Sequence, residues 1–147
     1  MSLDLQPIMI SGKEVLPLIE GGKGVAVSTG LSSGAWAAAG GVGTFSAVNA
    51  DRVDDNGEII RTVYHGRSRM ERFDELVAQG IEGGIKQAKI AHEVSNGNGR
   101  LHMNVLWEMG GAERVLEGVM EGARSEEHTS ELQSHHDIVC RLLPEKK

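Results

Sequence analysis

A glycine-rich segment after a short apolar run is the first group of residues suited to binding a ligand. Gly21 and Gly22 directly follow residues 15–20, and Lys23 stands beside them. Glycine has no Cβ, so a ligand can approach such a backbone closely. The strict dinucleotide-phosphate fingerprint needs a further glycine three positions after Gly24, and valine stands there. The segment therefore fits either a ligand site or a plain turn between a strand and a helix.

A second group of side chains near the C-terminus has the chemistry of a metal site. Imidazole, carboxylate and thiolate groups bind Zn²⁺, and a structural site needs four of them at close spacing. However, residues 124–134 read RSEEHTSELQS and resemble a translated sequencing-library adapter, and residues 137–146 resemble its second constant part with two substitutions. We therefore expect residues 124–147 to be an artefactual tail and no metal to be bound. The side chains concerned are His128, His135, His136, Asp137 and Cys140.

Composition limits the classes of protein that remain for residues 1–123, which suit one domain. Glycine accounts for 20 of the 147 residues and aromatic residues for only 3%, which predicts close backbone packing and many turns. The net charge of −6 argues against a nucleic-acid surface. No apolar run approaches the roughly 18 residues of a membrane span, and the N-terminus lacks a secretory pattern. We expect a cytoplasmic protein without nucleic-acid or membrane partners; the sequence leaves its oligomeric state open.

Three strand–helix units position these residues. A hairpin is expected around Gly12, and the first helix is capped by Ser28 or Thr29 and ends before Gly40 and Gly41. On that helix the apolar positions that share one face, and so are expected to be buried, are Leu31, Ala35, Trp36 and Ala39. Strands are predicted at 15–20, 42–48 and 101–106, later helices at 68–78, 81–94 and 112–121, and a long loop at 49–66.

Strands that alternate with helices predict parallel βαβ units and an α/β fold. Three units do not close a barrel, which needs eight strands. A doubly wound sheet can also begin in this way. Open units leave an unpaired strand edge and uncovered apolar helix faces, so we expect poor solubility of the isolated chain.

Three stretches together resemble the nitronate monooxygenase family, formerly called 2-nitropropane dioxygenases. They are residues 16–28 (LPLIEGGKGVAVS), 38–46 (AAGGVGTFS) and 103–106 (MNVL), in the family's order and at its intervals. Members of this family are flavin enzymes on a TIM (β/α)₈ barrel. The resemblance implies that residues 1–123 form a truncated N-terminal part of such a barrel, with about three βα units and bound FMN.

The resemblance also assigns cofactor-binding residues. Gly21, Gly22 and Lys23 at the end of the first strand, with Asn104 near the end of the third, are expected to contact FMN. Backbone N–H groups would bond the flavin ring, and an asparagine amide both donates and accepts. Lys23 stands where the family often has Met, and either lies near the flavin or points to solvent. Glu20 replaces a frequent Gln, and Asn104 is alternatively a hydrogen-bonded core amide.

The family's chemistry would be oxidation of an alkyl nitronate by O₂ to a carbonyl compound and nitrite. The family's catalytic histidine and phosphate-binding loops fall outside this sequence, so no catalytic residue is assigned and the chain alone is expected to be inactive. Two alternatives are an NAD(P)H-dependent flavin oxidoreductase acting on a quinone or an enoyl thioester, and a non-catalytic fragment. The remaining histidines, His65, His92 and His102, are expected to be structural or surface residues. The tryptophans, Trp36 and Trp107, are expected to serve packing rather than to stack on a ligand.

Overall fold

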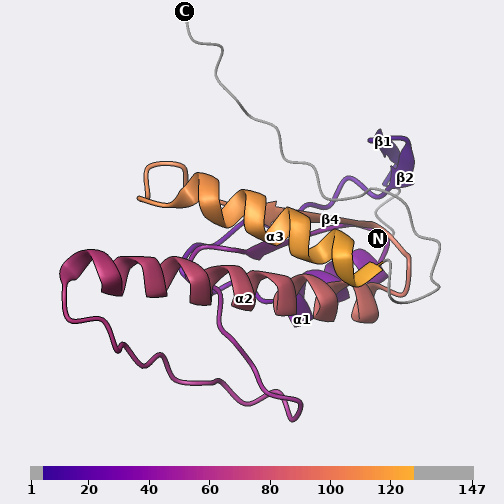
Figure 1. Ribbon diagram of the computed structural model, residues 1–147. Helices are drawn as coiled ribbons and strands as arrows, with labels where there is room; N and C mark the ends of the chain where they lie inside the picture. Colours follow the sequence, from indigo (N-terminus) through magenta and orange to yellow (C-terminus); the bar gives the residue numbers. More distant parts are fainter. Residues whose placement is uncertain (1–4, 128–147) are drawn as a thin grey trace, which may run out of the picture.

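The computed structural model describes residues 5–127 and shows a mixed α/β structure in which three helices lie against a small parallel sheet (Figure 1). Of the predicted tail, residues 124–127 form the end of the last helix, and the rest, with its candidate metal ligands, lies outside the described residues. The elements are β1 (Ile8–Ile10), β2 (Lys13–Val15), α1 (Gly30–Ala38), β3 (Val42–Ser46), α2 (Arg69–Ser95), β4 (Arg100–Asn104) and α3 (Ala112–Glu127).

The parallel sheet is formed by β3 and β4, with Ser46 opposite Asn104 at its carboxyl end. The chain before α1 adds a short parallel segment, because Ile19 forms an isolated bridge with Val42. Glu20 N–H donates to the Val42 carbonyl, and Val42 N–H donates to the Leu18 carbonyl, both at 2.8 Å. Residues 18–20, β3 and β4 therefore run parallel in sequence order, which confirms the predicted βαβ units. They form no closed barrel within residues 5–127.

The first predicted strand, 15–20, is only partly correct. Its first residue, Val15, ends β2, which pairs antiparallel with β1 in the predicted hairpin, while only Ile19 bridges to the parallel sheet. Pro17 lies between the two and cannot donate to a strand ladder, so the chain changes partners around it. Strands 42–48 and 101–106 were each predicted slightly too long at the carboxyl end.

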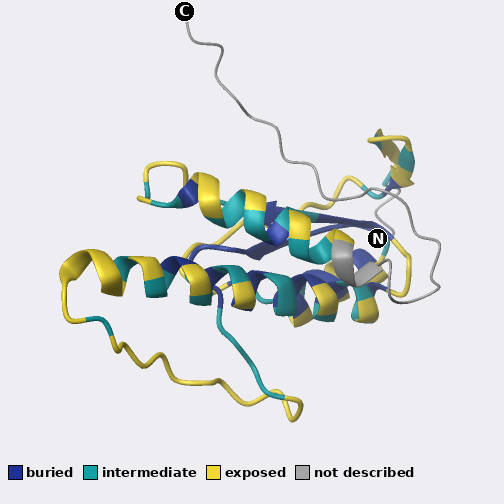
Figure 2. Cartoon of the chain, viewed as in Figure 1, coloured by how far each residue is buried: buried dark blue, intermediate teal, exposed yellow. Residues whose placement is uncertain are grey.

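One face of the sheet carries the core against the helices. Phe45 on β3 and Leu101 and Met103 on β4 are buried there together with small residues of α1 and α2. Figure 2 shows the buried residues concentrated where the helices meet the sheet, with exposed residues on the outer helix surfaces. The alternation along β4 leaves its other residues on the opposite face, which carries polar side chains.

The buried face of α1 was predicted wrongly. Small residues face the interior, namely Gly30, Ser33, Gly34 and Ala37, whereas Leu31 and Trp36 are largely exposed. The close approach of the α1 and α2 backbones explains why small residues are buried. A Cβ at Gly34 would lie 2.6 Å from Val94 Cβ of α2 and 2.9 Å from the Ala91 carbonyl oxygen. No large side chain fits between the two helices.

The two helices predicted at 68–78 and 81–94 are one helix, α2, which begins at a capping box between Ser68 and Glu71. Its glycines do not interrupt it, because they meet neighbouring elements rather than solvent. A Cβ at Gly84 would lie 2.5 Å from Val119 Cγ2 of α3, and one at Gly83 would collide with the Ala50 carbonyl. Gly83 and Gly84, which lie inside the second predicted helix, are thus packing positions.

The N-terminal hairpin is fastened to the amino end of β4 by two cations. The Arg100 guanidinium donates to the Ile10 carbonyl at 3.0 Å and also to the Ser11 carbonyl, and Lys13 Nζ donates to the Gly97 carbonyl at 2.5 Å. Hydrogen bonds from charged groups are stronger than neutral ones. The hairpin therefore closes this end of the sheet.

Gly43→Ala is expected to destabilise the fold, because its new Cβ would collide with the Ser33 carbonyl where α1 crosses β3. Forcing extra atoms into a close-packed contact costs about 1–3 kcal/mol. Urea unfolding measures the change. Gly24→Ala is the control, because a Cβ there meets nothing within 4 Å. An equal effect of the two substitutions would contradict the packing explanation.

Candidate functional site

The carboxyl ends of the parallel segments bring together two of the predicted cofactor-binding residues. An ideal Cβ at Gly22 would lie 2.7 Å from Asn104 Cβ, 2.8 Å from its Cγ and 3.1 Å from its Oδ1. The backbone of Gly22 therefore rests against the Asn104 side chain, although the two residues are far apart in sequence. Any larger residue at position 22 would displace that side chain.

The Asn104 amide group has no hydrogen-bond partner among the residues that the structure describes. Its side chain is partly exposed and makes no hydrogen bond within residues 5–127, although its backbone carbonyl accepts from Ala47 N–H at 3.0 Å. This does not fit the alternative of a hydrogen-bonded core amide. A polar side chain left without a partner at the end of a strand can both donate to and accept from a bound molecule.

A buried serine shapes the glycine-rich segment. Ser28 Oγ accepts from Lys23 N–H at 3.0 Å and donates to the Gly21 carbonyl at 3.4 Å, and Ser28 N–H donates to the Lys23 carbonyl at 3.3 Å. Ser28 is only 1% exposed. The Lys23 N–H and carbonyl are therefore both hydrogen-bonded to Ser28, and the N–H is not available to a ligand. The Lys23 residue as a whole is exposed. The sequence suggested Ser28 only as a helix cap, and that role belongs to Thr29.

The Glu20 carboxylate joins the end of the first parallel segment to its neighbours. It is buried, with Oε2 accepting from Thr44 N–H on β3 at 3.0 Å and Oε1 accepting from Ser32 Oγ on α1 at 3.0 Å. Both oxygens thus hold neighbouring elements. The glutamate at this position has a structural role, because it holds the chain where it enters the glycine-rich segment.

A row of polar side chains lies on the sheet face that points away from the helices. Thr44 is opposite His102, and Ser46 is opposite Asn104, in the parallel register. Burial, followed by the positive charge of Arg100, lowers the pKa of His102 below its ordinary value of 6.5. The imidazole is therefore neutral near pH 7 and able to donate and accept. The interpretation of His102 as a structural or surface residue did not anticipate its place below Asn104 on the same face.

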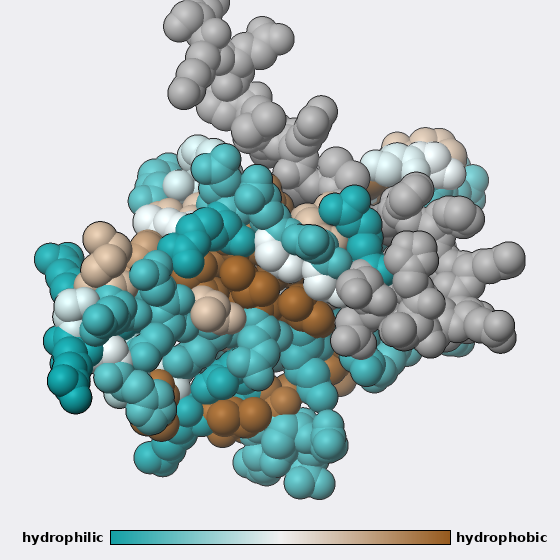
Figure 3. Space-filling model, viewed as in Figure 1, coloured by the Kyte–Doolittle hydropathy of each residue, from teal (hydrophilic) through white to brown (hydrophobic). Residues whose placement is uncertain are grey.

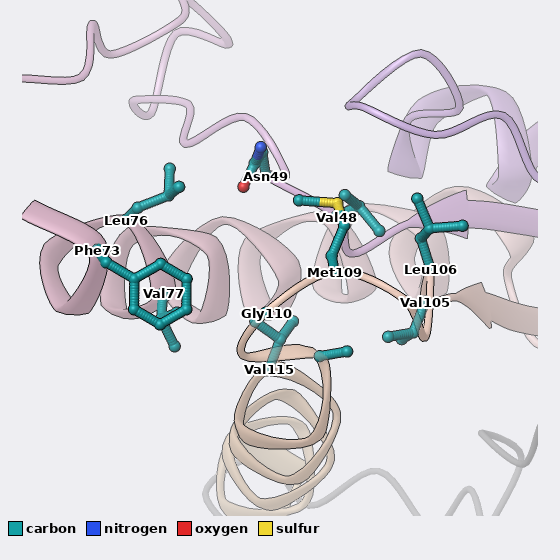
Figure 4. A pocket seen from close by; sticks show the side chains of 11 residues that line it. Val48, Asn49, Phe73, Leu76, Val77, Val105, Leu106, Met109, Gly110 and Val115 are labelled. Atoms are coloured by element: carbon teal, nitrogen blue, oxygen red, sulfur yellow. The ribbon is translucent and has the colours of Figure 1, made fainter. Parts of the chain in front are cut away.

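A mainly apolar hollow of about 100 Å³ lies elsewhere, between α2 and the start of α3 (Figure 4). Phe73 and Val77 of α2 face Val115 of α3 across it, and Asn49 supplies the polar side chain at its edge. Neither Gly22 nor Asn104 lines this hollow. The candidate site at Gly22 and Asn104 is therefore separate from this hollow.

The other predicted structural or surface residues are two histidines and two tryptophans. His65 is exposed, and its N–H donates to the Glu75 carboxylate, while His92 is part of α2. Trp36 and Trp107 are exposed rather than packed in the core, so the prediction of a packing role is wrong for both. Within residues 5–127, no three His, Cys, Asp or Glu side chains gather as a metal site would require.

Of the helices in the described part of the chain, none combines the length and the apolar character needed to cross a bilayer.

Comparison with known proteins returned no matching family model, no matching curated protein and no matching solved structure.

Glu20→Ala is expected to destabilise the protein by about 1–3 kcal/mol, because it leaves the buried Thr44 N–H without an acceptor. Glu20→Gln keeps one acceptor oxygen and should retain most of the stability. Urea unfolding measures both. Glu14→Ala, at an exposed position of β2, is the control and should change stability by less than about 0.5 kcal/mol. A fully stable Glu20→Ala variant would show that the carboxylate is not structural.

The lowered pKa of His102 predicts a loss of stability in acid. The unfolded chain, with a pKa near 6.5, takes up the proton more readily than the folded chain. The free energy of unfolding should therefore fall as the pH drops from above 6.5 towards the lower folded-state pKa. His102→Gln should show a smaller fall between pH 7.5 and pH 5.5 in urea unfolding. An unchanged fall, or a folded-state pKa above 6.5 by NMR titration, would contradict this account.

Proposed function

We propose that this chain forms the first three βα units of an FMN-dependent (β/α)₈-barrel oxidoreductase of the nitronate monooxygenase type. The parent enzyme would oxidise alkyl nitronates with O₂ to a carbonyl compound and nitrite. The observation that carries the proposal is the contact between Gly22 and Asn104, which the family resemblance assigned to one cofactor and which the fold brings together.

The topology supports this proposal. Residues 18–20, β3 and β4 run parallel in sequence order, with helices on one face, as the first three strands of a barrel do. Active sites of such barrels gather at the carboxyl ends of the strands. Gly22 and Asn104 lie at that end, one after the first parallel segment and one at the end of β4.

The residues present fit one edge of a flavin ring. Gly21 has open space where a Cβ would stand, so a flat molecule can approach its backbone. The unbonded Asn104 amide can donate to and accept from the polar edge of the ring. Bound FMN would supply the electron acceptor for the nitronate. The chain's own part is to orient that ring, with Gly22 keeping the Asn104 side chain in place.

The preference for nitronate over NAD(P)H chemistry rests on the resemblance of residues 16–28, 38–46 and 103–106 to the nitronate monooxygenase family. No catalytic residue is proposed within this chain. Its contribution to the parent enzyme is binding and orientation of the cofactor, and its phosphate contacts belong to later barrel loops.

Flavin titration of the chain, followed by quenching of flavin fluorescence, tests the proposal. Riboflavin and FMN should bind weakly and with equal affinity, because the proposed contacts reach the ring and not the phosphate. Gly22→Ala and Asn104→Ala should each weaken binding at least tenfold, the first by displacing the Asn104 side chain and the second by removing its amide.

Gly24→Ala is the matched control, because a Cβ there meets nothing within 4 Å and its backbone is not strained. It should leave flavin affinity unchanged. Absence of flavin binding by a folded chain, or equal losses in the Gly22 and Gly24 variants, would overturn the proposed site.

A further inference from the structure

A positively charged and apolar surface lies on the long loop before α2. Residues 59–70, which we call the basic segment, contain no Asp or Glu in a chain whose net charge is −6. Three arginines in it are exposed, and none is paired with a carboxylate in the described part of the chain: Arg61, Arg67 and Arg69. Exposed apolar side chains alternate with them: Ile59 (62%), Ile60, Val63, Tyr64 and Met70 (69%).

A surface of opposite charge lies along α3. Glu113, Glu117 and Glu121, which we call the acidic face, are exposed and fall four residues apart on one side of the helix. Like charges at this spacing repel one another, so the face gains from an external cation. Exposed apolar side chains, Leu106 and Trp107, lie just before the helix. The acidic face therefore matches the basic segment in both charge and apolar character.

The two surfaces are not joined within the described part of one molecule. Figure 1 shows the loop before α2 and helix α3 on opposite sides of α2, and within residues 5–127 no ion pair links an arginine of the basic segment to the acidic face. In the space-filling view from the same direction, apolar surface runs between α3 and α2 and appears again where the loop lies (Figure 3). Both surfaces are therefore available to a second molecule.

We propose that this chain pairs with a second copy of itself, the basic segment of each copy lying on the acidic face of the other. Two identical contacts related by a two-fold axis satisfy both surfaces at once. The acidic face extends about 12 Å along the helix at 1.5 Å per residue, and the extended chain from Arg61 to Arg67 reaches about 20 Å at most. The segment is thus long enough to cover the face.

The proposed dimer is sensitive to salt. Exposed charge pairs are screened over a Debye length of about 10 Å at 0.1 M salt and about 3 Å at 1 M. The dimer dissociation constant should rise at least tenfold between 0.05 and 0.5 M NaCl. Association through open strand edges, by contrast, relies on backbone hydrogen bonds and apolar contact, and salt does not weaken it in this way.

A charge exchange in sedimentation velocity at 0.05 M NaCl tests the pairing. Variant one carries Arg67→Glu and Arg69→Glu, and variant two carries Glu117→Arg and Glu121→Arg. Each alone places like charges at both contacts and should sediment as a monomer. Their equimolar mixture restores opposite charges at both contacts and should sediment as a dimer. Recovery in the mixture also shows that both variants are folded.

Glu14→Arg with Glu93→Arg is the matched control, because both positions are exposed and lie outside the two surfaces; it should leave the dimer intact. A monomeric wild-type chain would overturn the proposal, as would dimers of either variant alone or a mixture that stays monomeric. A monomeric chain that binds phosphatidylserine vesicles through Arg67 and Arg69 would assign the basic segment to a lipid surface instead.

Discussion

Close approach of backbones is the constraint on which the rest of this structure depends. Where α1 crosses β3, Gly43 leaves room for the Ser33 carbonyl, and where α2 crosses α3, Gly84 leaves room for Val119. With few aromatic side chains to fill space, the core relies on such contacts rather than on large interlocking side chains. This explains why α1 buries its small residues and exposes Leu31 and Trp36.

The candidate site follows from the same constraint at the carboxyl end of the sheet. Gly22 meets the Asn104 side chain only because the first parallel segment is held against β3, and the Glu20 carboxylate does this by accepting from Thr44 N–H. Ser28 then closes the segment from the other side. The buried Glu20 carboxylate and the buried Ser28 hydroxyl thus help to position Gly22 against Asn104 in the candidate site.

The sequence predicted what depends on local patterns. The alternation of strands and helices, the hairpin at Gly12 and the start of α2 at Ser68 are confirmed, and of the two predicted caps, Ser28 or Thr29, the second is correct. The contact between Gly22 and Asn104 was not predicted, because no local pattern joins distant positions; the family resemblance only assigned both residues to one cofactor. The buried face of α1 was missed because periodicity weighs apolar size, whereas the space between α1 and α2 admits only small residues.

The prediction of α2 as two helices was wrong for the same reason, because local patterns do not report tertiary contacts. Glycine in a helical pattern lowers intrinsic helix propensity by about 1 kcal/mol relative to alanine, so residues near Gly80 looked like a break. Tertiary contact outweighs that cost, since the bare positions at Gly83 and Gly84 let the loop after β3 and helix α3 come close. Local propensity contains no information about such neighbours.

The hairpin fastened by Arg100 gives the polar face of β4 two unlike ends. At its amino end the guanidinium is occupied by the Ile10 and Ser11 carbonyls, whereas at its carboxyl end the Asn104 amide has no partner among residues 5–127. The amino end of the strand is therefore committed to holding the hairpin, whereas no hydrogen bond within residues 5–127 depends on the side chain at its carboxyl end. Asn104 can be replaced without the loss of such a bond, and Arg100 cannot.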